Sequence, residues 1–127
     1  MQNFTTEQSA KTPFIEFNPQ SGHFTMRGKS IPENTVQFYK PLFEWLNEYV
    51  QSPFKTTTVD IQMDYFNTSS AKIFADLFHA LEKLQESGKS NVTINWQYNE
   101  EDDDMLEAGE DYKSITKVGF NLVSFKK

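Results

Sequence analysis

Residues 58–72 read TVDIQMDYFNTSSAK, and this stretch decides the fold because its pattern changes from that of a strand to that of a helix. Over 58–65, apolar and polar side chains alternate, which predicts a half-buried strand. Its apolar members are Val59, Ile61, Met63 and Tyr65. Over 69–87, apolar side chains recur at helical spacing and stop at Ser87-Gly88, which predicts a helix. The stretch therefore predicts a strand that passes directly into a helix.

Outward from this unit, further patterns predict the other elements. Residues 92–98 repeat the half-buried alternation, and 119–125 form the last predicted strand. Towards the N-terminus, 14–17 and 23–27 flank a turn that contains Pro19 and Gly22, as in a hairpin, and 28–35 are predicted to be a loop. A helix is expected to begin with Pro41 at its first position and to end near Val50, because proline is unfavourable inside a helix.

Strands with one polar face are typical of a sheet that is covered on one side only. We therefore predict an α/β (α+β) fold, a single mixed sheet of four to five strands with both long helices on one face. The strand-helix-strand unit should cross over with the right hand and make its two strands parallel. The chain should be one domain over 1–127, with 1–12 flexible and 99–113 an acidic loop or short helix.

Composition excludes several classes of protein. The 127 residues include no cysteine, so thiol catalysis, disulfides and cysteine-ligated zinc are excluded. The net charge is −6, and residues 99–111 hold eight acidic residues and no lysine or arginine. An acidic chain without a basic stripe is a poor ligand for nucleic acid or anionic membrane. No signal peptide or membrane-spanning run is recognisable, so we expect a cytoplasmic protein without membrane insertion.

The start of the predicted second helix carries more hydroxyl groups than capping requires. Asn67, Thr68, Ser69 and Ser70 follow one another, and one N-cap needs only one such side chain. A spare hydroxyl at a helix N-terminus is well placed to carry a phosphate, because the helix dipole and free N–H groups favour negative charge. Thr68 is the candidate, with Asp64 beside it and Lys72 one turn further on. The alternative is that these residues only cap the helix.

The acidic segment allows two interpretations. Its carboxylates could bind a divalent metal and support a hydrolase, although the spacing does not match the calcium-binding loop. We favour a solvated charge run, because the apolar residues within it suit a short helix docked on the body. A small-ligand or protein-binding module that uses this segment stays open as an alternative, as does a binding role for the polar sheet face. His23 and His79 are isolated, and no familiar enzyme motif is found, so no catalytic residue, metal or cofactor is predicted.

Four motifs, in order along the chain, resemble those of the SiaC-type regulatory phosphoproteins of bacterial biofilm and aggregation signalling. They are Phe17-Asn18-Pro19 with Gly22; residues 28–34, GKSIPEN; residues 65–72, YFNTSSAK; and Trp96-Gln97-Tyr98 followed by acids, Met105, Gly109 and Glu110. Two features depart from the family pattern: Thr35 stands where serine is expected, and the acidic segment is fuller.

The resemblance implies a fold like the STAS domains of anti-sigma-factor antagonists and a phosphoacceptor at Thr68. It implies that a dedicated kinase phosphorylates Thr68 and that a PP2C-type phosphatase removes the phosphate. The unmodified form would bind and activate a diguanylate cyclase, and the chain itself would have no catalytic activity. The residues expected around the acceptor are Asn67, Ser69, Ser70, Lys72 and Asp64, and the expected partner contacts are Glu33, Asn34, Asp102, Asp103, Glu107 and Glu110.

Overall fold

The computed structural model describes residues 1–126. The order of elements is β1 (Phe4–Thr6), β2 (Phe14–Asn18), β3 (His23–Ser30), α1 (Thr35–Tyr49), β4 (Thr56–Phe66), α2 (Thr68–Glu86), β5 (Asn91–Asn99), α3 (Asp103–Ile115) and β6 (Gly119–Phe125). The predicted class is confirmed, but the single sheet has six strands instead of four to five. Within the described residues, none of the helices has both the length and the apolar character that crossing a membrane requires.

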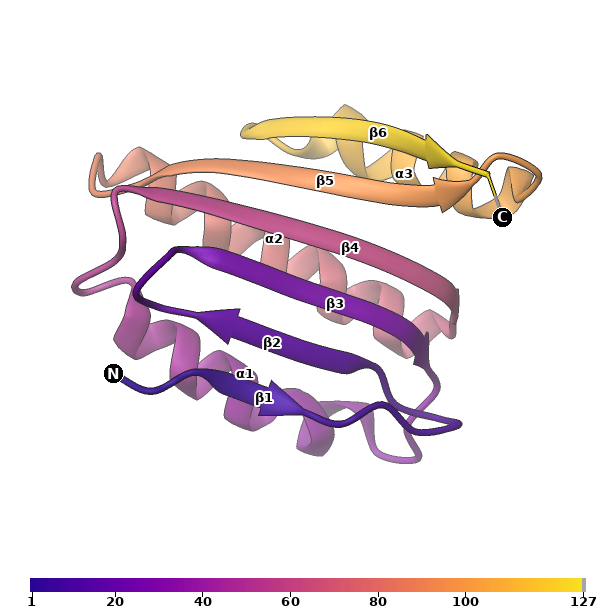
Figure 1. The fold of residues 1–127 in the computed structure, drawn as a ribbon, viewed down its shortest axis with the longest axis horizontal. Helices are drawn as coiled ribbons and strands as arrows, with labels where there is room; N and C mark the ends of the chain where they lie inside the picture. Colours follow the sequence, from indigo (N-terminus) through magenta and orange to yellow (C-terminus); the bar gives the residue numbers. More distant parts are fainter. Residues whose placement is uncertain (127) are drawn as a thin grey trace.

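The strands lie in the sheet in the same order as in the chain. β1, β2 and β3 pair antiparallel, whereas β3, β4, β5 and β6 pair parallel, so the predicted parallel pairing of β4 with β5 is confirmed. Each parallel connection contains one helix. Because such crossovers share one hand, α1, α2 and α3 all cover the same face, and Figure 1 shows them behind the sheet.

The core lies between the sheet and this helical layer. Trp96 of β5 is 1% exposed and sits at its centre, because its ring meets aromatic rings from α2, α3 and β6. These partner rings are Phe74, Phe78, Tyr112 and Phe120. The half-buried alternation of the strands thus has its apolar side under the helices, as predicted.

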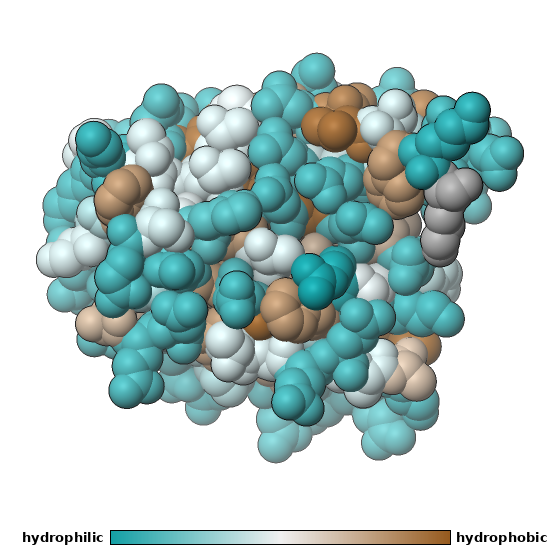
Figure 2. All heavy atoms as spheres, in the orientation of Figure 1, coloured by the Kyte–Doolittle hydropathy of each residue, from teal (hydrophilic) through white to brown (hydrophobic). Residues whose placement is uncertain are grey.

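The opposite face of the sheet is open and polar, and Figure 2 shows mainly hydrophilic residues across it. A row of hydrogen bonds crosses four strands there. His23 Nε2 lies 2.6 Å from Asp60 Oδ2, Asn95 Nδ2 donates to Asp60 Oδ1 at 2.8 Å, and Asn121 Nδ2 donates to Asn95 Oδ1 at 3.0 Å. Polar side chains of neighbouring strands therefore form hydrogen bonds with one another on this face.

β1 is the strand that the sequence did not predict. It has only three residues and no alternating run, so no local pattern marks it. Its partner is β2, with Phe4 opposite Phe17, and Trp45 Nε1 donates to the carbonyl oxygen of Gln2 at 2.8 Å. The flexibility expected for 1–12 stays a prediction.

The predicted start of the first helix at Pro41 is wrong, because α1 begins six residues earlier at Thr35. Asn34 is the N-cap, and its Oδ1 accepts a hydrogen bond from the N–H of Gln37 at 3.1 Å. Pro41 lies inside the helix, where it removes the N–H that would bond the carbonyl of Gln37. Both residues are exposed, so water can reach that carbonyl, while burial of side chains such as Tyr39 stabilises the early turns.

The predicted inward position of Tyr65 is also wrong, since 55% of this residue is exposed. The β3–β4 register shifts after Gly28, which pairs with Met63, while the next residue of β3 pairs with Tyr65. Asp64 is therefore the extra residue of a β-bulge. The bulge turns Tyr65 outwards and allows Phe66 to pack on the core.

Candidate functional site

One edge of the sheet carries the starts of all three helices. β3, β4 and β5 are parallel, and their carboxyl ends lead into α1, α2 and α3. The edge contains Asn34 and Asp102, the N-caps of α1 and α3, and Thr68, the first residue of α2. The strand-to-helix junction predicted at Thr68 is thus confirmed, at the edge where open α/β sheets usually bind ligands.

Asn67, and not one of the hydroxyl residues, caps α2. Its Oδ1 accepts a hydrogen bond from the N–H of Ser70 at 2.9 Å. Thr68 is exposed, and its hydroxyl has no hydrogen-bond partner within residues 1–126. The N–H groups of Thr68 and Ser69 precede the first intrahelical bond, so this end of α2 has partial positive charge. The structure therefore leaves a free hydroxyl where a phosphate group would be stabilised.

The hydroxyl of Ser70 points in the opposite direction, into the protein. Ser70 is fully buried, and its Oγ donates to the carbonyl oxygen of Ser30 at 2.9 Å. Ser30 Oγ lies 2.8 Å from Ser70 Oγ and 2.6 Å from the hydroxyl of Tyr39. We call Ser30, Tyr39 and Ser70 the junction cluster. It fastens the first turn of α2 to the end of β3 and to α1.

Tyr39 keeps its proton within this cluster. Its burial raises the pKa of the hydroxyl to about 12, although the hydrogen bond to Ser30 acts in the other direction. The hydroxyl is therefore neutral at physiological pH and serves the cluster as a hydrogen-bonding group.

Ser69 links α2 to α1 at the surface. Its Oγ lies 2.8 Å from Thr35 Oγ1 and also donates to Asn67 Oδ1 at 3.2 Å. Of the three consecutive hydroxyl residues, Ser69 and Ser70 are thus engaged in hydrogen bonds and Thr68 is not.

The charged residues expected around Thr68 are both exposed. Lys72 lies one turn along α2, and its Nζ is 3.7 Å from Asp76 Oδ2. Its side chain is 82% exposed, so the contact with Asp76 is a weak surface pair that leaves the ammonium free to move. Asp64 is the bulge residue before the junction and lines an acidic hollow.

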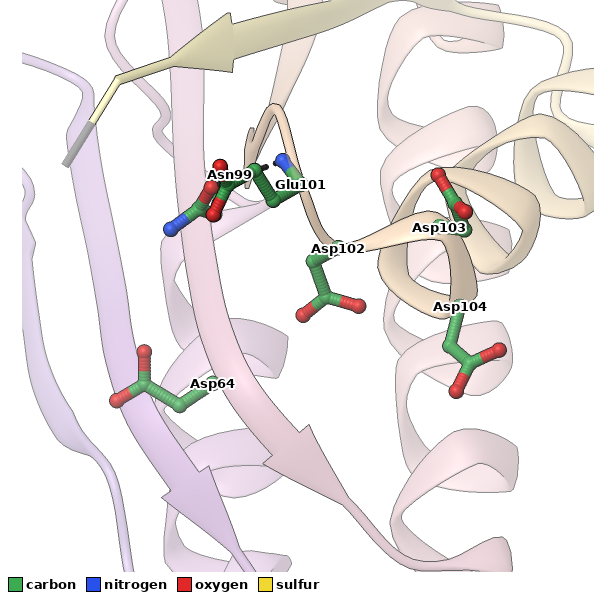
Figure 3. Close-up of a pocket in the computed structure, with 6 residues that line it drawn as sticks. All are labelled: Asp64, Asn99, Glu101, Asp102, Asp103 and Asp104. Atoms are coloured by element: carbon green, nitrogen blue, oxygen red, sulfur yellow. Dashed lines mark hydrogen bonds between the residues drawn. The ribbon is translucent and has the colours of Figure 1, made fainter.

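The acidic hollow has a volume of about 550 Å³ and lies between β4 and the start of α3. Figure 3 shows Asp64 on one side of it and Asp102, Asp103 and Asp104 on the other, with the carboxylates of Asp103 and Asp104 pointing in different directions. Within the described part of the chain, no group of three or more His, Asp or Glu residues is arranged to hold a metal ion. The metal-dependent alternative therefore has no assembled ligand set to support it.

The residues predicted as partner contacts fall into two groups. Glu33, Asn34, Asp102 and Asp103 lie at the same edge as Thr68, in or next to the loops that precede α1 and α3. Glu107 and Glu110 lie further along α3 and are exposed. The edge thus carries many acidic side chains beside Lys11, Lys29, Lys72 and the positive helix N-termini.

α3 is held on the body by its apolar side. Trp96 Nε1 donates to the carbonyl oxygen of Met105 at 3.0 Å. The hydroxyl of Tyr112 donates to the carbonyl oxygen of Ala71 at 2.7 Å. Gly109 is required at the closest approach, since a Cβ atom there would lie 2.5 Å from the Trp96 ring. Tyr112 therefore ties α3 to the first turn of α2.

Comparison with known proteins agrees with this arrangement over nearly the whole chain. The model of the SiaC family of regulatory phosphoproteins matches residues 6–125. The chain belongs to the SiaC family. It is 28% identical over 111 residues, 87% of each chain, to an uncharacterized protein of Pseudomonas aeruginosa strain UCBPP-PA14.

Solved structures of SiaC have the same fold as this family member. SiaC of Pseudomonas aeruginosa matches with a TM-score of 0.89 at 24% identity, covering 98% of this chain and 100% of that one. The crystal structure of the diguanylate cyclase SiaD in complex with its activator SiaC, from the same species, matches with a TM-score of 0.89 at 24% identity, over 96% and 99% of the two chains. Neither match is described as a STAS domain, so the expected likeness to STAS domains stays a prediction.

Sequence reasoning missed three residues at the junction of this SiaC family member. Ser30 was expected in a loop and instead ends β3, while Thr35 and Tyr39 were not assigned to the site. Hydroxyl residues near a capping Asn were visible in the sequence. Their contacts with α2 could not be predicted, because α1 separates β3 from β4 in the chain.

Proposed function

We propose that this chain is a phospho-switch adaptor in which the phosphorylation state of Thr68 controls the binding and activation of a diguanylate cyclase. One observation carries the proposal: Thr68 is the exposed, unbonded hydroxyl at the start of α2, while its neighbours Ser69 and Ser70 are hydrogen-bonded. Membership of a family of regulatory phosphoproteins supports it, since such a protein needs an accessible acceptor. The solved complex of SiaC with the cyclase that it activates suggests the class of effector.

The switch needs no large change of structure. A phosphate adds nearly two negative charges at an edge that already carries Asp64 and the acids of α3. An unpaired charge within an interface costs about 2 to 5 kcal/mol, roughly thirtyfold to several thousandfold in affinity. A rigid domain therefore suffices as a switch.

The proposed circuit has three partners. A protein kinase phosphorylates Thr68, a PP2C-type phosphatase removes the phosphate, and the cyclase responds to the unmodified form. Glu33, Asn34, Asp102, Asp103, Glu107 and Glu110 are the proposed contacts with these partners. The circuit would operate in the cytoplasm, where ATP for the kinase and GTP for the cyclase are present.

We also propose that the chain has no catalytic activity of its own. Strongly perturbed pKa values often mark catalytic groups. Among residues 1–126, the clearly shifted groups are Tyr39 and Tyr112. Burial raises the pKa of each to about 12, and both hydroxyls have structural hydrogen bonds.

The test begins with the mass of the protein purified from its native cells. We expect a single phosphate that disappears in Thr68→Ala and persists in Ser69→Ala, the matched loss of the adjacent hydroxyl. A protein that is never phosphorylated at Thr68 under any growth condition would contradict the proposal.

The second step measures the effector. Thr68→Ala should recover a diguanylate cyclase from cell extracts and raise its production of cyclic di-GMP, while Thr68→Asp should bind it at least about thirtyfold more weakly. Thr56→Asp is the matched control, because Thr56 is also exposed but lies at the opposite edge of the sheet. Equal binding by the Ala and Asp variants at position 68 would overturn the switch.

A further inference from the structure

The two edge strands of the sheet differ in how well they are protected from pairing with another chain. β1, at one edge, has only three residues and offers a short row of free backbone groups. β6, at the other edge, has seven residues, contains no proline and no charged side chain, and pairs with β5 without a bulge. Figure 1 shows no other element of residues 1–126 beyond it. Soluble proteins usually block such an edge with a charge, a proline or a bulge, so an unblocked edge indicates a strand partner.

The free backbone groups of β6 belong to alternate residues. The N–H of Glu100, which follows β5, donates to the carbonyl oxygen of Phe125 at 2.9 Å, so the backbone groups of Phe125 point towards β5. Successive residues of a strand point their N–H and C=O groups to opposite sides, so those of Phe120, Leu122 and Ser124 point towards the free edge. Two copies of β6 that run antiparallel can therefore exchange hydrogen bonds between Phe120 of one and Leu122 of the other.

That pairing places Asn121 of each copy on a two-fold axis, opposite its counterpart. Asn121 ends the row of hydrogen bonds on the open face: its Nδ2 donates to Asn95 Oδ1, and its own Oδ1 has no partner within residues 1–126. A second Asn121 can donate to that Oδ1, so the row continues into the next copy. On the covered face, half-buried Leu122 meets Phe120 of the other copy, which extends the core.

α3 lies close enough to the free edge to take part in the same contact. Gly109 lies against Trp96 of β5 and Leu122 of β6, so α3 sits above the gap between these two strands. Neighbouring strands are roughly 4.8 Å apart, so the α3 helices of two joined copies would be separated by two such spacings, roughly 10 Å. Helices in contact pack at about 8 to 10 Å, so these two helices would touch.

The outer side of α3 carries charges of both signs. Ala108 packs on the core, and the hydroxyl of Tyr112 reaches α2. By helical spacing, the opposite side of α3, towards the free edge, carries Leu106, Glu110 and Lys113. Glu110 and Lys113 are exposed and free to meet charges of another molecule.

The two-fold axis that suits β6 also aligns these charges. α3 connects two parallel strands, so it runs opposite to β6. The axis at Asn121 lies about 3.3 Å from the level of Leu122, which corresponds to about two residues of α3 beyond Gly109. It therefore crosses α3 between Glu110 and Lys113. Glu110 of each copy then lies opposite Lys113 of the other.

We propose that β6 pairs antiparallel with β6 of a second copy of this chain, centred on Asn121, with the two α3 helices side by side. A second copy is the fitting partner because one axis satisfies both the strand pairing and the exchange of Glu110 with Lys113. The inference goes beyond the proposed function, since neither β6 nor the outer side of α3 contains Thr68. Glu110, proposed above as a contact with the other partners, would contact the second copy instead.

The first test measures the oligomeric state of the purified chain by sedimentation equilibrium. We expect a monomer–dimer equilibrium with a dissociation constant below about 0.1 mM. Asn121→Lys places two ammonium groups on the axis and should raise that constant roughly tenfold or more. Gln97→Lys adds the same charge to the same face one strand further in, and should change it by less than about twofold. A chain that stays monomeric at about 0.1 mM, or a dimer that Asn121→Lys leaves intact, would overturn the proposal.

The second test exchanges the charges on α3. Glu110→Lys and Lys113→Glu should each weaken self-association about fivefold, because each puts like charges opposite one another at two symmetric places. The double variant restores opposite charges and should dimerise like the parent, and the two single variants should prefer each other when mixed. Glu107→Lys makes the same change of charge on the exposed side of α3 away from the second copy, and should have no effect. Single variants that are not rescued in the double variant would show that the copies do not meet in this way.

The third test locates the contact. Raising the protein concentration should slow amide hydrogen exchange at Phe120 and Leu122 and leave β1, at the opposite edge, unchanged. Protection at β1, or at neither edge, would contradict the proposal. A photo-crosslinking amino acid in place of exposed Val123 should join two copies of this chain in native cells. Capture of an extended segment of a different protein instead would mean that β6 pairs with another chain and that the second copy is wrong.

Discussion

Two clusters of buried hydroxyl groups, at opposite edges of the sheet, are built in nearly the same way. The junction cluster lies below the start of α2. The second, which we call the distal cluster, consists of Tyr49, Thr57 and Ser90. Thr57 Oγ1 lies 2.8 Å from the Tyr49 hydroxyl and 2.7 Å from Ser90 Oγ, which donates to the carbonyl oxygen of Phe54 at 2.7 Å.

Each cluster joins a tyrosine of α1 to two hydroxyl residues on neighbouring elements, and an exposed threonine lies close by in sequence. That threonine is Thr68 at the junction cluster and Thr56 at the distal cluster. The distal edge contains the C-terminus of α1, whereas the junction edge contains three helix N-termini. A phosphate is stabilised at helix N-termini and destabilised at C-termini. Buried hydroxyl groups thus stabilise both edges of the sheet. The direction of the helices distinguishes Thr68, the candidate phosphoacceptor, from Thr56.

The largest expected effect is the loss of stability at alkaline pH through Tyr39. The pKa of Tyr39 is about 12 in the folded protein and about 10 in the unfolded chain, so its stabilising contribution is complete below pH 10 and is lost as the pH rises towards 12. Two pKa units correspond to about 2.7 kcal/mol. Urea unfolding between pH 9 and 12, as a test range, should show a decline that is smaller in Tyr39→Phe. Tyr112, whose pKa is also about 12, adds to the decline. An identical slope in Tyr39→Phe would mean that burial does not raise the pKa of this hydroxyl.

The next effect comes from removing matching serines from the two clusters. Ser70→Ala and Ser90→Ala each remove a hydroxyl that donates to a backbone carbonyl and contacts another hydroxyl. Each should lower the free energy of unfolding by about 1 to 3 kcal/mol. Only Ser70→Ala should also speed amide hydrogen exchange at 70–72, because the first turn of α2 loses its attachment to β3. Faster exchange at 70–72 in both variants would remove the distinction between the edges.

A smaller effect is expected at the link between α3 and the junction edge. Tyr112→Phe removes the hydrogen bond to the carbonyl oxygen of Ala71, worth about 1 kcal/mol. Exchange should rise at 70–72 and stay unchanged around Ser90. A change around Ser90 of the same size would show that the two edges open together.

The smallest effect is expected for Lys72→Gln. The Lys72–Asp76 pair is exposed and separated by 3.7 Å, so the free energy of unfolding should change by less than about 0.5 kcal/mol. In the phosphorylated protein, the phosphate should titrate at a higher pH in Lys72→Gln, as measured by phosphorus NMR, because a nearby cation favours the dianion. An unchanged phosphate titration would show that Lys72 does not reach the group on Thr68.

Much of the fold was predictable because its signals are local. β4 and β5 alternate apolar and polar residues, and α2 has a wide apolar stripe, so their existence and the parallel pairing followed from sequence. The start of α1 was not predicted correctly, because the penalty for Pro41 is offset by side chains that pack against the sheet. Tyr65 followed the alternation in sequence, and only the register of β3 against β4 reveals the bulge.

The sequence by itself determined where β4, α2 and β5 form, that Asn67, Thr68, Ser69 and Ser70 supply more capping groups than α2 needs, and that the acids concentrate in one segment. The tertiary structure decided which hydroxyl stays free: Ser70 turns inward to Ser30, Ser69 bonds Thr35, and Thr68 is left exposed. The physical reason is the range of the interactions. Periodicity and capping involve residues within one or two turns, whereas these hydrogen bonds join residues 34 and 40 positions apart, which meet only when β3, α1 and α2 pack together.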